Sequence, residues 1–363
     1  MLALDGTVIR PPLSGVHYAV KNQIIALLRH CSPGQLVCFT LDAEIRAAAG
    51  RAQTGAPALP PGLRRVSRRI LWQQTALPGR LRRLGCDRLF ALAYTAPVKC
   101  PVPYALQVHD TIALRRPLLC NRLNALHMRT LMPGSIRRAE TIITSSTRVA
   151  DEVVRIGCVG QAKVHVVPLG VDDIFLADTP PPPLPDAIRE LKPYILFVGN
   201  IEPKKDLGTL VAAFDKLAAY EVNLILAGRV GWRCRDVVDR IKAYKGRGTI
   251  KRLGYIDRRL LPALYGEAAA FVMPSVEEGF GLPVLEAMAC QTPVVHSDHP
   301  VLGETANNLG VTFPAGDAEA LAACLKEILR SPAGNNEAAR AYAYSRTWDL
   351  WAATIGEITG WFQ

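Results

Sequence analysis

Short apolar runs alternate with longer amphipathic stretches along most of the chain. Residues 35–41, 104–108 and 194–198 are such runs, and residues 4–9 form a weaker one. A strand that is buried on both faces of a parallel sheet is apolar throughout, so these runs predict internal parallel strands. The stretches between them, such as residues 207–219, have the length and spacing of helices. The alternation predicts α/β sheets that are covered by helices on both faces.

The most informative stretch is FVMPSVEEGFGLPVLEAMAC at residues 271–290, where an apolar strand leads through a glycine-rich turn into a helix. The predicted helix begins at Leu282, and its first amides point back toward the turn without partners inside the helix. Together with the positive end of the helix dipole, these amides predict an anion site, most naturally for a phosphate. The candidate binding residues at this turn are Gly279, Phe280, Gly281 and Leu282.

Two carboxylates flank this predicted anion site. Glu278 lies in the turn, and Glu286 lies in the helix, about 6 Å along the axis from its start. A carboxylate beside an anion site is explained if it accepts hydrogen bonds from hydroxyl groups. A phosphate flanked by hydroxyl-rich groups describes a sugar nucleotide. The ordinary alternative is one surface acid and one acid on a helix face.

The spacing Glu278-x7-Glu286, with GFGLP between the glutamates, resembles the signature of the retaining glycosyltransferases of family 4. The resemblance implies the GT-B fold, in which two Rossmann-like, doubly wound domains face a central cleft. It also implies that Glu278 contacts hydroxyls of the donor sugar and that Glu286 contacts the ribose of the nucleotide.

Two segments of the first half also resemble positions that this family uses. Residues 104–108 end in His109-Asp110, and ligands are expected at the carboxyl ends of strands in an open α/β sheet. A core histidine and a helix-capping aspartate are the alternatives. The resemblance implies that this pair faces the donor sugar. Gly15, at the start of the first predicted helix, resembles the glycine loop with which the family approaches the donor phosphate.

The loop GNIEPKK at residues 199–205 follows a buried strand and carries two lysines. Lysine side chains neutralise a diphosphate as point charges. The resemblance implies that this loop supplies a basic pair to the diphosphate, with Lys205 at the position of the family's lysine. Asn200 stands where many members have arginine, so the second charge is expected from Lys204 or from Arg229. Surface lysines are the alternative.

The length of 363 residues predicts two domains of ordinary size. The segment TPPPPLP at 179–185 is a stiff polyproline connector, which places the first domain at 1–178 and the second at 186–345. Tryptophans and isoleucines form one stripe in the last segment, which indicates an amphipathic helix within 346–363. The resemblance implies that this helix crosses back onto the first domain.

The net charge of +11 comes from the first half, because residues 1–178 carry +12 and residues 179–363 carry −1. Residues 63–88 hold eight arginines and one acid, interleaved with apolar side chains. Such a stretch predicts contact with anionic lipid headgroups or an acidic acceptor. A solvated arginine face is the alternative, and the aromatic platforms and motifs expected for nucleic acid are absent. The arginines concerned are Arg64, Arg65, Arg68, Arg69, Arg80, Arg82 and Arg83.

Nine scattered cysteines without a C-x-x-C spacing indicate a reducing compartment and argue against a zinc site. The adjacent acids Asp172-Asp173 are interpreted as a turn and not as metal ligands. The sequence also has no apolar run of membrane-spanning length and no signal-peptide pattern. We therefore expect a cytoplasmic protein that is peripheral at the inner face of the membrane.

The resemblance to family 4 implies a retaining hexosyltransferase that needs no metal. The strings GNIEPKKDL and RRILWQQTALPGRLRR resemble mannosyltransferases of bacterial polysaccharide assembly, which favours GDP-mannose as donor and a lipid-linked saccharide or polysaccharide as acceptor. UDP-sugars remain an alternative donor class. A GT-B nucleotide-sugar epimerase or phosphorylase, and a non-catalytic nucleotide-sugar-binding or assembly protein, remain alternative functions.

Overall fold

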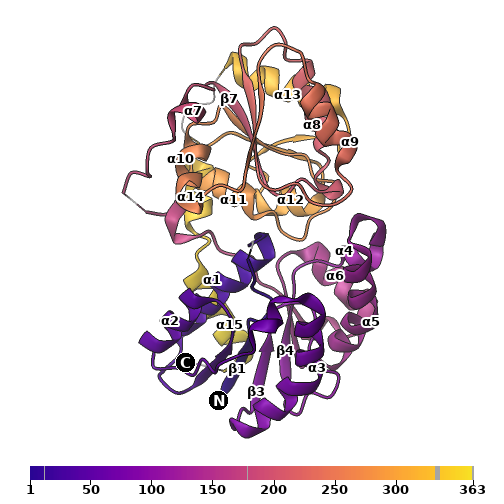
Figure 1. The fold of residues 1–363 in the computed structure, drawn as a ribbon, viewed down its shortest axis with the longest axis vertical. Helices are drawn as coiled ribbons and strands as arrows, with labels where there is room; N and C mark the ends of the chain where they lie inside the picture. Colours follow the sequence, from indigo (N-terminus) through magenta and orange to yellow (C-terminus); the bar gives the residue numbers. More distant parts are fainter. Residues whose placement is uncertain (12, 178, 332–335, 362–363) are drawn as a thin grey trace. The chain divides into compact units, whose positions relative to one another are not determined.

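Two parallel, six-stranded sheets organise the chain (Figure 1). The structure is a computed structural model that describes residues 1–11, 13–177, 179–331 and 336–361. It divides into a first unit, Met1–Gly170 with the chain from Trp348 onward, and a second unit, Val171–Thr347. The proline-rich segment 179–185 thus lies within the second unit. The domain limits 178 and 363 of the sequence analysis lie outside the described residues.

The first sheet has the strand order β2-β1-β3-β4-β5-β6, and all of its neighbours are parallel. Its strands are nearly continuous apolar runs, as expected for a sheet with both faces covered. The strands are β1 (Leu2–Asp5), β2 (Leu36–Phe39), β3 (Arg88–Ala91), β4 (Tyr104–Val108), β5 (Thr141–Thr144) and β6 (Val164–Val166).

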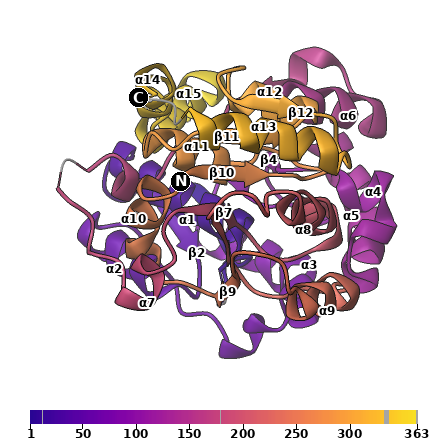
Figure 2. The same cartoon turned by 90° about the horizontal axis from the view of Figure 1, so that it is seen from above.

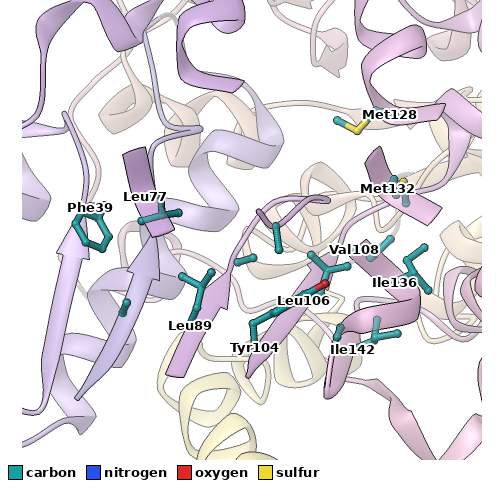
Figure 3. Packing of buried hydrophobic residues seen from close by; sticks show 14 of the residues in the cluster. Phe39, Leu77, Leu89, Tyr104, Leu106, Val108, Met128, Met132, Ile136 and Ile142 are labelled. Atoms are coloured by element: carbon teal, nitrogen blue, oxygen red, sulfur yellow. The ribbon is translucent and has the colours of Figure 1, made fainter. Parts of the chain in front are cut away.

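Alternate residues of these strands face two different layers of helices. Leu89 and Leu106 face a buried cluster that also contains Leu77 of α3 and Met132 and Ile136 of α5 (Figure 3). Burying such large apolar side chains contributes about 1.5–3 kcal/mol each. The helices of this unit are α1 (Gly15–His30), α2 (Ala43–Arg51), α3 (Val66–Arg83), α4 (Ile112–Arg115), α5 (Arg122–Arg138), α6 (Thr147–Gly157) and α15 (Trp348–Thr359), with 3₁₀ turns η1 (Pro61–Arg64), η2 (Pro117–Leu119) and η3 (Gln161–Lys163).

Helix α15 follows the second unit in the sequence but belongs to the first unit, where it packs against α1. The indole of Trp351 stacks on Phe90 of β3, with ring centroids 6.2 Å apart and an interplanar angle of 9°. Because Phe90 points to the opposite face of the sheet from Leu89, α15 covers the face that the Leu89 cluster leaves open.

The second sheet has the strand order β12-β11-β10-β7-β8-β9, again with only parallel neighbours. It is the doubly wound arrangement in which the first strand of the unit, β7, lies at the centre. The strands are β7 (Tyr194–Val198), β8 (Asn223–Ala227), β9 (Ile250–Gly254), β10 (Ala270–Met273), β11 (Val294–Ser297) and β12 (Val311–Phe313).

The helices of the second unit lie around its sheet (Figure 2), and two of them begin at an aspartate that caps their first amides. Asp206 accepts a hydrogen bond from the Thr209 amide at the start of α8, and Asp317 accepts one from Glu319 at the start of α13. The helices are α7 (Asp186–Arg189), α8 (Leu207–Asp215), α9 (Arg235–Ala243), α10 (Leu261–Gly266), α11 (Leu282–Ala289), α12 (Pro300–Thr305), α13 (Ala318–Arg330) and α14 (Glu337–Tyr344), with 3₁₀ turns η4 (Asp173–Phe175), η5 (Pro203–Lys205) and η6 (Arg258–Leu260).

The predicted strands 104–108 and 194–198 match β4 and β7. The first strand is present, but its predicted bounds of 4–9 are wrong, since β1 spans Leu2–Asp5. The side chain of Asp5 accepts a hydrogen bond from the Thr7 amide at 3.1 Å, and the Ile9 amide donates to the Gly6 carbonyl. These bonds turn the backbone away from the ladder directly after Asp5. None of the helices in the described ranges has the length and hydrophobicity of a membrane span.

Candidate functional site

The second sheet has its topological switch point between β7 and β10. Strand β7 is followed in sequence by β8 on one side, whereas β10 is followed by β11 on the other side. The loops after β7 and β10 therefore leave in opposite directions and open a crevice at the carboxyl ends of the strands. The loop after β7 carries Lys205, and the loop after β10 carries Glu278.

Lys205 and Glu278 form an ion pair between these two loops. Their side chains are only 11% and 8% exposed, and the backbone links the same loops through a 2.9 Å hydrogen bond from the Val276 amide to the Lys204 carbonyl. Burial alone would raise the pKa of Glu278, but the charges of Lys205 and Lys204 and the hydrogen bond from Lys205 outweigh it and lower that pKa. Glu278 is therefore ionised at neutral pH.

The turn after Glu278 leads directly into α11. Gly281, the N-cap residue, has φ +97°, a backbone conformation that favours glycine, and a Cβ built there would lie 2.8 Å from Leu302. No side chain of the described residues caps this helix end, and Pro283 stands in its first turn. Gly279, Phe280, Gly281 and Leu282 thus place an uncapped helix N-terminus next to the ion pair, as an anion site requires.

Glu286 is buried on α11 and uses both of its carboxylate oxygens within the second unit. Arg258 donates to Oε1, and the Tyr265 hydroxyl donates to Oε2, each at 2.9 Å. Arg258 also donates to Asp172 at 2.9 Å and lies over the Phe175 ring. Burial opposes the charge of Arg258, but the two carboxylates outweigh it and raise the pKa of this guanidinium. Any ribose contact of Glu286 would have to use the remaining lone pairs of its oxygens.

The other predicted diphosphate contacts lie on neighbouring loops. Asn200 donates to Glu202 at 3.4 Å, whereas the guanidinium of Arg229 lies over the Tyr255 ring at 5.0 Å. The loops after β7 and β8 are joined by a 2.8 Å bond from the Ile201 amide to the Arg229 carbonyl. Two of the candidate basic residues, Lys205 and Lys204, have charges that lower the pKa of Glu278. The third, Arg229, is exposed.

In the first unit, His109 and Asp110 lie at the end of β4. Nε2 of His109 donates to the Leu92 carbonyl at 3.0 Å, and Asp110 accepts hydrogen bonds from the Tyr94 hydroxyl and the Ile112 amide. Burial lowers the pKa of His109, although the Leu92 carbonyl and the charge of Asp110 oppose this effect. The imidazole is therefore neutral at pH 7, and its Nδ1 is the acceptor nitrogen.

Gly15 is the first residue of α1, and a Cβ built there meets no atom within 4 Å. Ser14 precedes it as the N-cap residue, and its amide donates to Nδ1 of His17 at 3.2 Å. In this structure His17 therefore takes part in capping α1.

Sequence reasoning missed two groups of buried polar side chains in the second unit. It did not identify Arg258, because an arginine in a short 3₁₀ turn carries no periodic signal. It also missed Glu277, whose buried carboxylate lies 3.6 Å from Nε2 of His299. Among the described residues, no group of three or more His, Cys, Asp or Glu is arranged to hold a metal ion.

The arginine-rich segment forms η1 and α3, but its arginines do not share one surface. Arg65, Arg68, Arg82 and Arg83 are exposed, and Arg80 is half-buried and donates to the Ala58 carbonyl. Including Arg69 in this surface was wrong, because Arg69 is on the buried side of α3 with Trp72 and Leu77. The side chain of Arg64 lies outside the described residues.

Two family models match the chain and follow its two units closely. The model "Glycosyltransferase Family 4" matches residues 14–174, and the model "Glycosyl transferases group 1" matches residues 185–348. The chain therefore belongs to the glycosyltransferases that these two models, family 4 and group 1, describe.

Individual relatives agree with this assignment. The O-antigen chain mannosyltransferase B of Escherichia coli is 29% identical over 228 residues, which cover 61% of this chain and 60% of that protein. Glycogen synthase of Mycobacterium tuberculosis is 29% identical over 265 residues, covering 71% of this chain and 62% of that protein. The chain thus spans about 60% of the length of the curated relatives it matches.

The solved structures include sucrose-phosphate synthase from Thermosynechococcus elongatus, with a TM-score of 0.76 and 21% identity over 98% of this chain and 97% of that one. This likeness, together with the two six-stranded parallel sheets, shows that the fold is GT-B.

A double-mutant cycle on Lys205→Met and Glu278→Gln should give a coupling energy of about 1–3 kcal/mol in urea unfolding of the second unit, because the pair is nearly buried. The exposed pair Lys242–Asp239, 3.7 Å apart, is the matched control and should give less than about 0.5 kcal/mol. The folded-state pKa of Glu278 is lowered, so the coupling is present above the unfolded pKa and should disappear as the pH falls through the folded one. If the coupling energy at pH 7 is no larger than that of the control pair, Lys205 and Glu278 do not form a stabilising ion pair.

Arg258→Met should destabilise the second unit by about 3–5 kcal/mol, because it leaves the carboxylates of Glu286 and Asp172 without their shared cation. The neighbouring exposed Arg259, which pairs with Asp257, provides the control. Arg259→Met should change the unfolding free energy by no more than about 0.5 kcal/mol. Equal effects of the two substitutions would show that Arg258 does not join these acids.

Proposed function

We propose that the protein is a metal-independent, retaining glycosyltransferase that moves a hexose from a nucleotide sugar to a lipid-linked or polysaccharide acceptor. Family membership supports the class of reaction. The observation that carries the proposal is the Lys205–Glu278 ion pair at the switch point of the second sheet, next to the uncapped N-terminus of α11. Cationic, anionic and amide groups meet there, as a sugar diphosphate requires.

Glu278 is suited to hold the donor sugar. Its lowered pKa keeps it ionised, and an ionised carboxylate only accepts hydrogen bonds. Lys205 is bonded to Oε1, and a carboxylate offers about four lone-pair sites, so acceptor capacity remains for sugar hydroxyls. The lysine thus fixes the carboxylate before the donor arrives, which reduces the reorganisation needed during reaction.

The departing diphosphate of the donor needs positive charge beside it. When the bond between the anomeric carbon and the diphosphate oxygen breaks, negative charge develops on the diphosphate, and fixed positive groups beside it lower the barrier. Lys205, Lys204 and the amide end of α11 would supply that charge without a metal ion. Glu286, with Arg258 and Tyr265 holding its carboxylate, would orient the nucleotide ribose.

Retention of anomeric configuration would follow from attack by the acceptor hydroxyl on the face that the diphosphate leaves. In the first unit, the neutral imidazole of His109 and the carboxylate of Asp110 are assigned to the donor sugar. Nδ1 of His109 is an acceptor for a sugar hydroxyl, since Nε2 donates to Leu92. Gly15 is assigned to the approach of the donor phosphate.

Mannose from GDP-mannose is the donor that we propose. The E. coli relative is named as an O-antigen chain mannosyltransferase, and its match supports the same sugar for this chain. UDP-sugars are the rival donor class, because the residues at the switch point recognise the sugar diphosphate and not the base.

An anionic membrane surface is the proposed location, on the cytoplasmic side. Arg65, Arg68, Arg82 and Arg83 are exposed on and beside α3, and Leu71 of the same helix is 63% exposed. Exposed arginines with an exposed leucine fit lipid headgroups, because the charges attract anionic phosphates and the apolar side chain enters the interface.

Glu278→Gln and Lys205→Met should each lower the rate of hexose transfer at least about 100-fold, because each removes a charged contact to the donor. Transfer is measured with purified protein, radiolabelled GDP-mannose and membranes as acceptor source. Glu319→Gln and Lys242→Met, at exposed positions of the same unit, are matched controls and should retain the wild-type rate.

A thermal-shift panel of GDP, UDP and ADP identifies the base and separates loss of binding from loss of chemistry. GDP should raise the unfolding temperature of the wild type more than UDP or ADP. Near-normal transfer by either folded site variant would overturn the assigned roles. Nucleotide binding without turnover of any donor would favour a non-catalytic binding protein.

Replacing Arg65, Arg68, Arg82 and Arg83 together by Gln should lower binding to phosphatidylglycerol vesicles by up to about 1000-fold, since four basic residues at about 1 kcal/mol each contribute about 4 kcal/mol near an anionic surface. Co-sedimentation measures the bound fraction. A control replaces Lys242, Lys245, Arg247 and Lys251, which are exposed on the second unit, and removes the same total charge. If both sets weaken binding equally, α3 is not the contact surface.

A further inference from the structure

The loop after β3 contains a residue in a strained backbone conformation. Tyr94 has φ +64°, which lies in the left-handed region. An L-residue with a large side chain rarely adopts this conformation, because its Cβ comes too close to the following carbonyl oxygen. Such strain persists only where the surrounding contacts hold the residue in place, and strained residues gather at functional sites.

Side chains of two helices hold the backbone directly after Tyr94. Gln73 of α3 donates to the Thr95 carbonyl at 3.0 Å and accepts from the Thr95 hydroxyl at 3.1 Å. The Ala96 amide donates to the hydroxyl of Ser135, on α5, at 3.1 Å. These bonds fix the two residues after Tyr94 and thereby maintain its left-handed conformation.

The same loop contacts the end of β4 at four points. The Tyr94 amide donates to the Gln107 carbonyl at 2.9 Å. The Leu92 carbonyl accepts a hydrogen bond from Nε2 of His109 at 3.0 Å. The Tyr94 hydroxyl donates to Oδ2 of Asp110 at 2.8 Å. The Tyr94 ring meets the imidazole of His109 edge to face, with centroids 5.5 Å apart and an interplanar angle of 66°, so its side chain contacts both members of the His109–Asp110 pair.

These contacts hold the pair in one orientation. Both carboxylate oxygens of Asp110 have a partner, because Oδ1 accepts from the Ile112 amide at 3.0 Å and Oδ2 accepts from Tyr94. The imidazole of His109 is 5% exposed, is bonded through Nε2 and packs against the tyrosine ring. Rotation of either side chain would break a contact with the loop after β3, so the Nδ1 acceptor of His109 has a fixed direction.

A structural role alone does not account for a tyrosine at this position. Glycine or asparagine would adopt the left-handed backbone conformation with less strain. The bonds that fix Thr95 and Ala96 do not involve the side chain of Tyr94. A residue that breaks a local rule is expected where it serves a function. What the tyrosine adds here is its contact with His109 and Asp110.

We propose that Tyr94 is a positioning residue for hexose transfer. Its hydroxyl fixes the carboxylate of Asp110 and its ring fixes the imidazole of His109, in the orientation in which the pair receives the donor sugar. This inference rests on the proposed function, which assigns the pair to that sugar. Groups that are oriented before the reaction need no reorganisation during it. Loss of the tyrosine hydroxyl should therefore lower the rate of transfer more than the affinity for the donor, whose diphosphate is assigned to the second unit.

Tyr94→Phe tests this role, because it removes the hydroxyl and keeps the ring. It should lower kcat for hexose transfer about 10- to 100-fold, since a misplacement of about 1 Å in a site has effects of up to this size. KM for the nucleotide sugar should change less than about 3-fold. Transfer is measured with the purified full-length protein, radiolabelled GDP-mannose or UDP-glucose, and membranes as acceptor source.

Tyr104→Phe is the matched control. Tyr104 on β4 is buried, and its hydroxyl also donates a hydrogen bond of 2.8 Å, to the Ser135 carbonyl. Each substitution removes one such bond from the same unit, so both should lower the unfolding temperature by similar amounts. Tyr104→Phe should nevertheless keep the wild-type kcat, because its hydroxyl does not contact the pair. A merely structural role of Tyr94 would give both variants the same kcat.

A second substitution tests whether Tyr94 acts through Asp110. Asp110→Ala removes the acceptor of the tyrosine hydroxyl, so adding Tyr94→Phe to it should lower kcat by no more than about 2-fold further. If the two effects on kcat multiply instead, the hydroxyl does not act through Asp110 and the positioning role is wrong.

Two other results would also overturn the positioning role of Tyr94. One is a kcat of Tyr94→Phe equal to that of Tyr104→Phe, and the other is a raised KM with an unchanged kcat. Either result would leave the proposed function standing, because the wild type would still transfer hexose. A wild type that transfers hexose from neither nucleotide sugar would overturn the proposed function, and this inference with it.

Discussion

The ion pair between Lys205 and Glu278 is the contact on which the second unit's chemistry depends. It joins the loops that diverge from β7 and β10, at the one place where this sheet's connections run in opposite directions. Neither side chain is near the other in sequence, so the pair exists only once the parallel sheet has formed. Its near-complete burial makes the lysine charge effective, and that charge in turn holds the carboxylate ionised.

Both units pair a buried carboxylate with arginine side chains. Around α11, Arg258 is held by Asp172 and Glu286, and Tyr265 completes the partners of Glu286. That network joins one cation to two carboxylates, so each of its charged groups has a partner before any ligand binds. In the first unit, the buried carboxylate of Glu152 is likewise held by Arg115 and Arg148, each at 3.0 Å. A fully satisfied network of this kind contributes rigidity.

Much of the fold follows from local sequence, because buried parallel strands are apolar runs that need no long-range information. Residues 104–108 and 194–198 are such runs, and the strands match them. The turn at 279–281 and its flanking acids were also visible, since the glycines and the helix start lie within a few residues. Two features were not predictable in this way. The partnership of Arg258 with Glu286 spans two elements, and the burial of Arg69 depends on which side of α3 faces the sheet.

Helix α15 has a consequence for how the protein is made. Its Trp351 stacks on Phe90 and closes one face of the first sheet, yet the ribosome completes the whole second unit before it reaches that tryptophan. During synthesis, the face of the first sheet that carries Phe90 therefore stays without its Trp351 contact while the second unit can fold. The unit that is translated first is the one that is completed last, and a chaperone that shields apolar surface would act on that face.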